Sequence, residues 1–361
     1  MERALSTLHD MEEHCVVPSL PIYNDIIHGF ARKKEFDKSK NMLSKMVEAG
    51  LLPTPETYNG LIRAYGDYKL YDQMSKCVKE MESKGCFPNE VTYNFLLEEY
   101  ARGGLFERME RLYRTLQSKR MNLQPHALLT MLEAYADLGI LEKMEKMFRR
   151  FLHSEAYMKE NLIRKLAMVY IEHHRFVRLE EFGNEISSRT GRTDIVWCIL
   201  LLASACLLSR KGVESVVREM DTAKVEFILT HTNILGLFYL KINDFKALNG
   251  ALSRIEMHKL KPDMVTFGIL FDACKIGYNG IRVLEVWKRN GYLERAVEMN
   301  TDPLVLGAFG KGSFIRNCEK TYSSLKYKGK ERKLWTYGKL ISLVFGGRKD
   351  GQDNLLQAGK R

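Results

Sequence analysis

A pattern with a period of 35 residues recurs along this chain of 361 residues. The pair Tyr-Asn occurs at residues 23–24, 58–59 and 93–94, so each copy follows the last by 35 residues. Other residues that keep this interval are Pro18, Pro53 and Pro88, Met46 and Met81, and Gly50 and Gly85. A unit of this size cannot bury an apolar core alone. The sequence therefore predicts an array of stacked, similar units.

The register of these units can be followed through the whole chain. Units are expected to begin at Leu20, Pro55, Glu90, Pro125, Glu160, Asp194 or Ile195, Leu229, Met264, Met299 and Leu334. The pattern is clear in the first three units and again from Leu229, and it is degenerate over 125–228. We therefore expect about nine repeats over 20–333, the C-terminal half of a leading repeat at 1–19, and a partial repeat with a basic tail at 334–361.

Each unit has the pattern of two helices. In the second unit the apolar residues at i, i+3, i+4 and i+7 of the first helix are Tyr58, Leu61, Ile62 and Tyr65. This spacing places them on one face of a helix. The second helix covers Met74–Met81, and Gly85 and Pro88 end it. The predicted fold is all-α, a solenoid of helix–turn–helix repeats.

The charge is concentrated at one end of the sequence. The chain has a formal net charge of +11, and residues 299–361 hold 13 Lys and Arg against 5 Asp and Glu. A basic end of this kind favours a polyanionic partner, and a solvated surface that aids solubility is the alternative.

Several classes of protein are excluded by composition. The 7 cysteines are odd in number and form no C-x-x-C pair, which argues against a disulfide scaffold and a zinc module. The longest apolar run, Ile195–Leu208, is shorter than a membrane span, so we expect no membrane segment. We see no catalytic module, metal site or cofactor motif. The N-terminus has no recognisable targeting peptide, and we expect any such segment to be missing from this sequence.

The repeats resemble a known family. The motif Thr-Tyr-Asn near the start of a unit, and the segments "GLLPT" and "GCFPN" near its end, are similar to those of pentatricopeptide repeat proteins of the plain type. This resemblance implies a right-handed superhelix that binds single-stranded RNA in plant organelles, with about one base per repeat and so at most about nine nucleotides. It also implies that the fifth and last residues of each repeat select the base, while the second residue packs against it.

The resemblance assigns candidate RNA-binding residues. The pairs of fifth and last residues that retain Asn are Asn24/Thr54, Asn59/Asn89, Asn94/Gln124 and Asn233/Asp263. An Asn side chain offers donors and an acceptor for a base edge. The pair Asn59/Asn89 resembles the family's pyrimidine pair, and Asn233/Asp263 resembles its uracil pair. The other two pairs are weakly pyrimidine. At Leu129, Gly268 and Pro303 the fifth residue has no side chain that can bond to a base.

Helix capping and core packing are alternative roles for several residues of these motifs. The last residues Thr54, Asn89 and Asp263 stand just before a helix, where such side chains cap free backbone N–H groups. The three repeated tyrosines could stack on bases, but they lie on the apolar stripe, so we expect Tyr23, Tyr58 and Tyr93 in the core.

Basic and aromatic residues near the end of the sequence give further candidates. A basic run late in the ninth unit supplies candidate phosphate contacts at Lys326, Lys328, Lys330, Arg332 and Lys333. An exposed helix end is the alternative for this run. Trp335 would either stack on a base or cap the core.

The sequence therefore predicts a sequence-selective RNA-binding protein, not an enzyme, that acts in organellar RNA processing. Intron splicing, transcript maturation and stabilisation all remain open. Chloroplast is preferred to mitochondrion. The partners would be single-stranded organellar RNA and other RNA-processing proteins. The alternative is a protein–protein interaction scaffold or homodimer, formed through the degenerate middle or through an exposed surface at 196–208.

Overall fold

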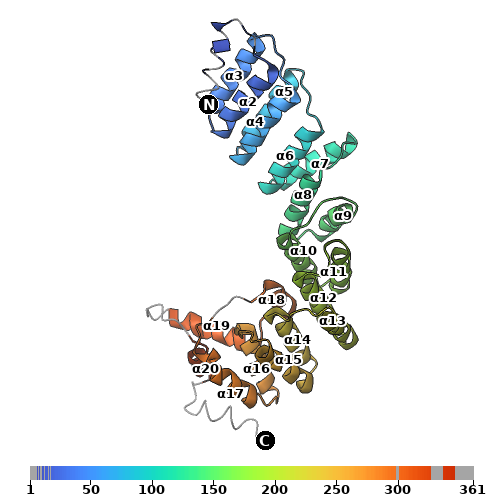
Figure 1. Cartoon of the computed structure of the whole chain (residues 1–361), viewed down its shortest axis with the longest axis vertical. Helices are drawn as coiled ribbons and strands as arrows, with labels where there is room; N and C mark the ends of the chain where they lie inside the picture. Colours follow the sequence, from blue (N-terminus) through green and yellow to red (C-terminus); the bar gives the residue numbers. More distant parts are fainter. Residues whose placement is uncertain are drawn as a thin grey trace. The chain divides into compact units, whose positions relative to one another are not determined.

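The computed structural model describes residues 18–297, 301–326 and 336–345, together with residues 6, 8, 10, 11, 13, 14 and 16. Over these ranges the secondary structure is helical, and the only β-type pairing is an isolated bridge between Ala296 and Thr336. Before residue 290, short connections join successive helices, as Figure 1 shows. The all-α solenoid expected from the repeat is therefore confirmed. The chain divides into two compact parts, an N-terminal part of residues 1–159 and a C-terminal part of residues 160–361.

The described residues of the N-terminal part form four helix pairs. They are α2 (Leu20–Arg32) with α3 (Phe36–Glu48), α4 (Pro55–Asp67) with α5 (Tyr71–Ser83), α6 (Glu90–Arg102) with α7 (Phe106–Ser118), and α8 (Pro125–Asp137) with α9 (Leu141–Leu152). The first helix of each pair packs on the first helix of the next, so α2, α4, α6 and α8 are neighbours in that order. We call the surface formed by these first helices the first-helix face.

The C-terminal part continues the same arrangement. Its pairs are α10 (Glu160–Glu172) with α11 (Phe176–Thr190), α12 (Asp194–Cys206) with α13 (Arg210–Thr222), α14 (Leu229–Lys241) with α15 (Phe245–Met257), and α16 (Met264–Lys275) with α17 (Ile281–Arg289). The later elements are the 3-10 helix η1 (Tyr292–Glu294), α18 (Pro303–Phe309), α19 (Ser313–Lys326) and α20 (Tyr337–Phe345). The first helices α10, α12, α14 and α16 again pack in series and form the first-helix face of this part.

Local signals in the sequence set where these helices begin. The first helices of the eight repeats before Met299 all begin at a residue that the 35-residue register predicts, and the sixth begins at Asp194. Asn89 accepts a hydrogen bond from the backbone N–H of Thr92 at 2.9 Å, and Asp263 accepts one from Thr266 at the same distance. These side chains satisfy backbone donors that a helix leaves unpaired. The expectation that both residues cap a helix is confirmed.

A recurring left-handed residue ends the first helix. In α4 this residue is Lys69, with φ of 58°, and the N–H of Leu70 then bonds to the Tyr65 carbonyl at 2.8 Å. The same place in other repeats is occupied by Lys34, Gly104, Gly139, His174, Leu208 and Asn243, all with positive φ. This geometry satisfies carbonyl groups at the helix end and reverses the chain into the second helix.

The core consists of the apolar stripes of both helices in each pair. The repeated tyrosines Tyr23, Tyr58 and Tyr93 are all buried, which confirms their expected place in the core. In α12 every residue from Ile195 to Ala205 is buried, so this run offers no exposed interface; of the proposed surface at 196–208, Leu207 and Leu208 are exposed. None of the helices formed by described residues is long and apolar enough to cross a membrane.

The ninth unit departs from the repeat geometry. Its first helix, α18, begins only at Pro303, the fifth position of the unit, because a proline is tolerated in the first turn of a helix but not in its interior. Gly310, with φ of 72°, ends it after seven residues. This short helix packs on α10, α12 and α14, while α19 packs on α16 in its place. The last regular repeat among the described residues is therefore the one that begins at Met264.

Candidate nucleic-acid interface

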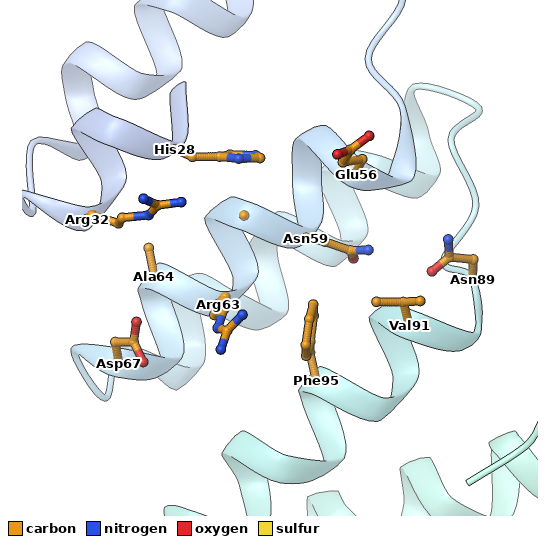
Figure 2. Close-up of a pocket in the computed structure, with 11 residues that line it drawn as sticks. His28, Arg32, Glu56, Asn59, Arg63, Ala64, Asp67, Asn89, Val91 and Phe95 are labelled. Carbon is orange, nitrogen blue, oxygen red and sulfur yellow. The ribbon is translucent and has the colours of Figure 1, made fainter. Parts of the chain in front are cut away.

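The first-helix face of the N-terminal part contains a cavity of about 530 Å³ between α2, α4 and α6. The residues that line it are His28, Arg32, Glu56, Asn59, Gly60, Arg63, Ala64, Asp67, Asn89, Val91 and Phe95. The cavity therefore brings together Asn59 and Asn89, the fifth and last residues of the second repeat. Figure 2 shows Asn59 projecting from α4 toward Val91 and Asn89, beside the ring of Phe95.

Asn59 has an unused hydrogen-bonding group in this cavity. Its side chain is 8% exposed, and its Oδ1 atom is buried without a hydrogen-bond partner among the described residues. Leaving a buried acceptor unpaired costs about 1–3 kcal/mol. This cost is recovered when a ligand supplies a donor, so the geometry favours a polar ligand beside Asn59. Asn24, the fifth residue of the first repeat, has the same unpaired Oδ1 atom.

Asn89 caps a helix and lines the cavity at the same time. Its Oδ1 atom accepts hydrogen bonds from the backbone N–H and the hydroxyl of Thr92, both at 2.9 Å. Among the described residues its amide nitrogen donates no hydrogen bond. The capping bonds hold the side chain in place and leave this nitrogen as a donor at the cavity wall.

An apolar and aromatic wall faces the two asparagines. Val91 is 37% exposed although it is a large apolar residue, and Phe95 lies one helical turn further along α6. The guanidinium of Arg63 stands over the Phe95 ring, 5.4 Å from its centre. Exposed apolar and aromatic side chains at a polar cavity provide surfaces on which a base can stack. The repeat pattern alone did not single out Val91, Phe95 or Arg63; Val91 is the second residue of its repeat, the position that the resemblance assigns to packing.

The charges around the cavity are mixed, and its two arginines have no carboxylate partner among the described residues. Arg32 and Arg63 form no ion pair with any described residue, whereas the carboxylates of Glu56 and Asp67 are also present. The ring of His28 bonds to the carbonyl of Thr57 at 3.2 Å. Two unpaired guanidinium groups beside a base-sized cavity are suited to contact phosphate groups.

The pair Asn94/Gln124 of the third repeat is bonded differently. The Nδ2 atom of Asn94 donates to the carbonyls of Glu90 and Asn122 at 2.9 and 3.0 Å, and its Oδ1 atom accepts from the backbone N–H of Gln124 at 2.8 Å. Asn94 is fully buried. Its amide holds the loop before α8 against α6, so it is engaged within the chain.

The pair Asn233/Asp263 of the seventh repeat is also bonded within the chain. The Nδ2 atom of Asn233 donates to Asp263 at 3.1 Å, and its Oδ1 atom accepts from the hydroxyl of Thr266 at 2.8 Å. The second oxygen of Asp263 accepts from the hydroxyl of Thr301 at 2.8 Å. Asn233 is 1% exposed and Asp263 is 7% exposed. Both residues are therefore enclosed.

The other candidate residues are placed only in part. Thr54 donates its backbone N–H to the hydroxyl of Thr57 at 3.1 Å, at the start of α4. Lys326 is the last residue of α19, and its side chain is outside the described part. The other residues of the basic run and the candidate for base stacking also lie outside the described residues. These are Lys328, Lys330, Arg332, Lys333 and Trp335. In the part of the chain that the structure describes, no group of three or more His, Cys, Asp or Glu side chains is arranged to hold a metal ion.

Comparisons with known proteins match the repeats. The model of the PPR (pentatricopeptide) repeat family matches residues 18–67 and 53–102, and that of the PPR repeat matches 91–121. A chloroplastic pentatricopeptide repeat-containing protein of Arabidopsis thaliana is 46% identical over 185 residues, which make up 51% of this chain and 37% of that relative. The matched part thus spans little more than a third of the relative's length.

Solved structures of two proteins align with most of this chain. The crystal structure of the pentatricopeptide repeat protein PPR10 from maize aligns over 99% of this chain and 55% of its own, with 17% identity and a TM-score of 0.41. The structure of yeast Rmd9p in complex with a 16-nucleotide target RNA aligns over 90% of this chain and 79% of its own, with 10% identity and a TM-score of 0.40. The family-model matches, the Arabidopsis relative and the 35-residue helix pairs show that this chain contains pentatricopeptide repeats.

Proposed function

We propose that this protein binds single-stranded RNA and that the cavity on α2, α4 and α6 holds one of its bases. The observation that carries this proposal is the buried, unpaired Oδ1 atom of Asn59 beside the free amide nitrogen of Asn89. A base edge presents donors and acceptors that match such a pair of amides. The cavity volume of about 530 Å³ lies within the range of small-ligand sites.

Each wall of the cavity has a separate part in this proposal. Val91 and Phe95 supply the surface against which the base packs, and this contact is insensitive to base identity because every base has an apolar face. Asn59 and Asn89 bond to the base edge and select a pyrimidine. Arg32 and Arg63 neutralise phosphates on either side of the bound nucleotide.

We further propose that the protein acts in organellar RNA processing without chemistry of its own. Holding a short RNA segment would protect it from nucleases or keep it unfolded for splicing or maturation, together with other RNA-processing proteins. The chloroplast is the proposed compartment, with the mitochondrion as the alternative. The support for this choice is the 46% identity to a relative that is named as chloroplastic.

The test is RNA binding by the full chain and by Asn59→Ala. Pyrimidine-rich and purine-rich single-stranded RNAs are compared by fluorescence anisotropy at two salt concentrations. We expect pyrimidine-rich RNA to bind more tightly and Asn59→Ala to weaken it by roughly tenfold, as the loss of a hydrogen bond to a buried group would. Asn41→Ala, at an exposed asparagine of α3, is the matched control and should bind as the unmodified chain does.

Three results would contradict the proposal in whole or in part. If Asn59→Ala and Asn41→Ala bind RNA equally, the cavity does not hold a base. If the unmodified chain binds no RNA at moderate salt, the protein–protein interaction scaffold takes first place. Binding that is tight but independent of salt would also argue against contacts to phosphates.

A further inference from the structure

The helix α18 lies across the first-helix face of the C-terminal part. It packs against α10, α12 and α14, which are the first helices of the fifth, sixth and seventh repeats. Figure 1 shows α18 beside α12 and α14. A segment that follows the eighth repeat in sequence therefore folds back over three earlier repeats. In the N-terminal part the corresponding face contains the open cavity beside Asn59.

The packing of α18 is that of a core element. Leu304 and Val305 are 2% and 1% exposed. Gly307 lies against α10 so closely that a Cβ atom at this position would come within 2.9 Å of the sulfur of Met168. The Sγ atom of Cys206 lies 3.9 Å from the carbonyl oxygen of Ala308. These contacts leave no space for another molecule between α18 and the helices beneath it.

Polar residues just before α18 contact the base-selecting positions of these repeats. The carboxylate of Asp302 pairs with Arg164, the fifth residue of the fifth repeat, at 2.6 Å, and the Asp302 side chain is 8% exposed. The hydroxyl of Thr301 donates to Asp263, the last residue of the seventh repeat, at 2.8 Å. Asp263 in turn accepts a hydrogen bond from Asn233, the fifth residue of that repeat. The groups that would meet RNA are thus used by the chain itself.

We propose that residues 301–310 form a plug that occupies the RNA path over the fifth to seventh repeats. This inference rests on the proposed RNA binding and adds its regulation. With the plug in place, RNA binds at the cavity of the N-terminal part and does not reach the fifth to seventh repeats. Displacement of the plug exposes Arg164 and the pair Asn233/Asp263, and the bound segment lengthens.

The chemistry of the plug fits competition with RNA. Asp302 presents an acidic group to Arg164, as a phosphate would, so the two ligands compete for one guanidinium. RNA can reach this face only in the fraction of molecules from which the plug has left. The apparent affinity for a long RNA is reduced by that fraction. The plug therefore shortens the segment that is bound without closing the cavity at Asn59.

The test releases the plug without changing the helices beneath it. In the double variant Leu304→Asp/Val305→Asp, two carboxylates replace buried apolar side chains, which disfavours the packed position of α18. A milder variant, Thr301→Val/Asp302→Asn, removes the hydrogen bond to Asp263 and the negative charge that pairs with Arg164, and it keeps the apolar packing. The milder variant keeps the test informative if the double variant does not fold, and circular dichroism reports folding in both.

The first readout follows the plug and needs no RNA. Burial raises the pKa of the Cys206 thiol to about 11, so it reacts slowly while Ala308 covers it. Plug release should make alkylation of Cys206 several-fold faster. Cys77 lies in the N-terminal part and is the internal reference, whose rate should not change.

The second readout is the length of polyuridine RNA that each protein protects from nuclease. At one base per repeat, release of the plug over three repeats should increase the protected length by about three nucleotides. Affinity for long polyuridine should rise, and affinity for a segment of about four nucleotides should stay the same.

The outcomes separate the plug from the proposed function. Faster alkylation of Cys206 with an unchanged protected length would overturn the plug and leave RNA binding at Asn59 intact. An unchanged alkylation rate in both variants would show that α18 is not displaceable, which also overturns it. If neither the unmodified chain nor the released variants bind RNA, both proposals are wrong.

Discussion

The second and seventh repeats place equivalent residues in opposite situations. Asn59 and Asn89 line an open cavity, and each retains an unused hydrogen-bonding group. Asn233 and Asp263 stand at the same two positions of their repeat, but they bond to each other, to Thr266 and to Thr301. The same two repeat positions therefore carry unpaired groups at a cavity in one part of the molecule and form an internal hydrogen-bond network in the other.

This difference indicates what decides whether a fifth or last residue is free to bind a ligand. The backbone position is the same in both repeats, because each last residue caps a first helix through its Oδ1 atom. The difference lies in the bonds of the fifth residue: Asn233 bonds to Asp263 and Thr266, whereas Oδ1 of Asn59 has no partner and faces a cavity. Thr301 then covers the second oxygen of Asp263. At these positions an unpaired hydrogen-bonding group is a better indication of a ligand site than the residue type is.

The largest effect on stability is expected at Asp263. In Asp263→Ala the helix loses its cap, and the buried side chains of Asn233 and Thr266 lose a partner. We expect the free energy of unfolding to fall by about 3 kcal/mol, since each unsatisfied buried group adds its own cost. Asn89→Ala is the matched control: it loses the cap and the bond from the Thr92 hydroxyl but no bond to a fifth residue, so the loss should be smaller, about 2 kcal/mol. Equal losses in urea unfolding would show that the two networks do not differ.

A smaller effect is expected at Asn94. Asn94→Ala removes two donated hydrogen bonds and leaves the backbone N–H of Gln124 unpaired, so the free energy of unfolding should fall by about 2 kcal/mol. Asn59→Ala removes a buried acceptor that has no partner, so stability should stay nearly the same. The effects on RNA binding should have the opposite order: Asn59→Ala should weaken binding more than Asn94→Ala does. A stable Asn94→Ala protein with weakened RNA binding would assign Asn94 to the interface.

The sequence predicted the local structure well because its determinants are local. Pro55 and Pro125 at helix starts, Asn89 and Asp263 as caps, and the apolar stripe at helical spacing all act within a few residues. Their recurrence every 35 residues therefore predicted the start of the first helix in each of the eight repeats before Met299. The same apolar stripe predicted that Tyr58 is buried, as the structure confirms.

The position of α18 could not be predicted in this way. It depends on a pair, Arg164 and Asp302, that is 138 residues apart in sequence, and on apolar burial of Leu304 that no local pattern encodes. The local signal was Pro303 at a fifth position, which shortens the helix but does not say where it packs. The hydrogen bonds of Asn94 could not be predicted from the sequence either, because its partner Asn122 lies in a loop.

Arg63 at the cavity allows a test of whether RNA binding there depends on contacts to phosphates. Arg63→Gln should weaken RNA binding several-fold and reduce the slope of log affinity against log salt by about 0.7, the value for one phosphate contact on a single strand. Arg111→Gln, at an exposed residue of α7, is the control for total charge and should change the slope less. Equal changes in both variants would mean that the whole field of the protein, rather than the cavity, attracts RNA.

The smallest effect concerns pH and separates the two parts of the molecule. His231 takes the third position of its repeat, where the second, third and eighth repeats have Thr57, Thr92 and Thr266. Burial lowers the pKa of His231 below its usual 6.5, and nearby Asp194 offsets part of this decrease. Because the folded-state pKa is depressed, the stabilising contribution is present above pH 6.5 and is lost as the pH falls through the folded-state value.

The free energy of unfolding should fall when His231 becomes protonated, and this loss should be confined to the C-terminal part. Hydrogen exchange of α14 between pH 7 and pH 5 should report it, with α4 as the reference. His231→Thr restores the residue of the other repeats and should remove this dependence while keeping a hydroxyl that accepts from the last residue's N–H, as Thr266 does for Asp263. If the stability of His231→Thr still falls with pH, groups other than His231 cause the decrease. The pH would then not distinguish the C-terminal part from the N-terminal part.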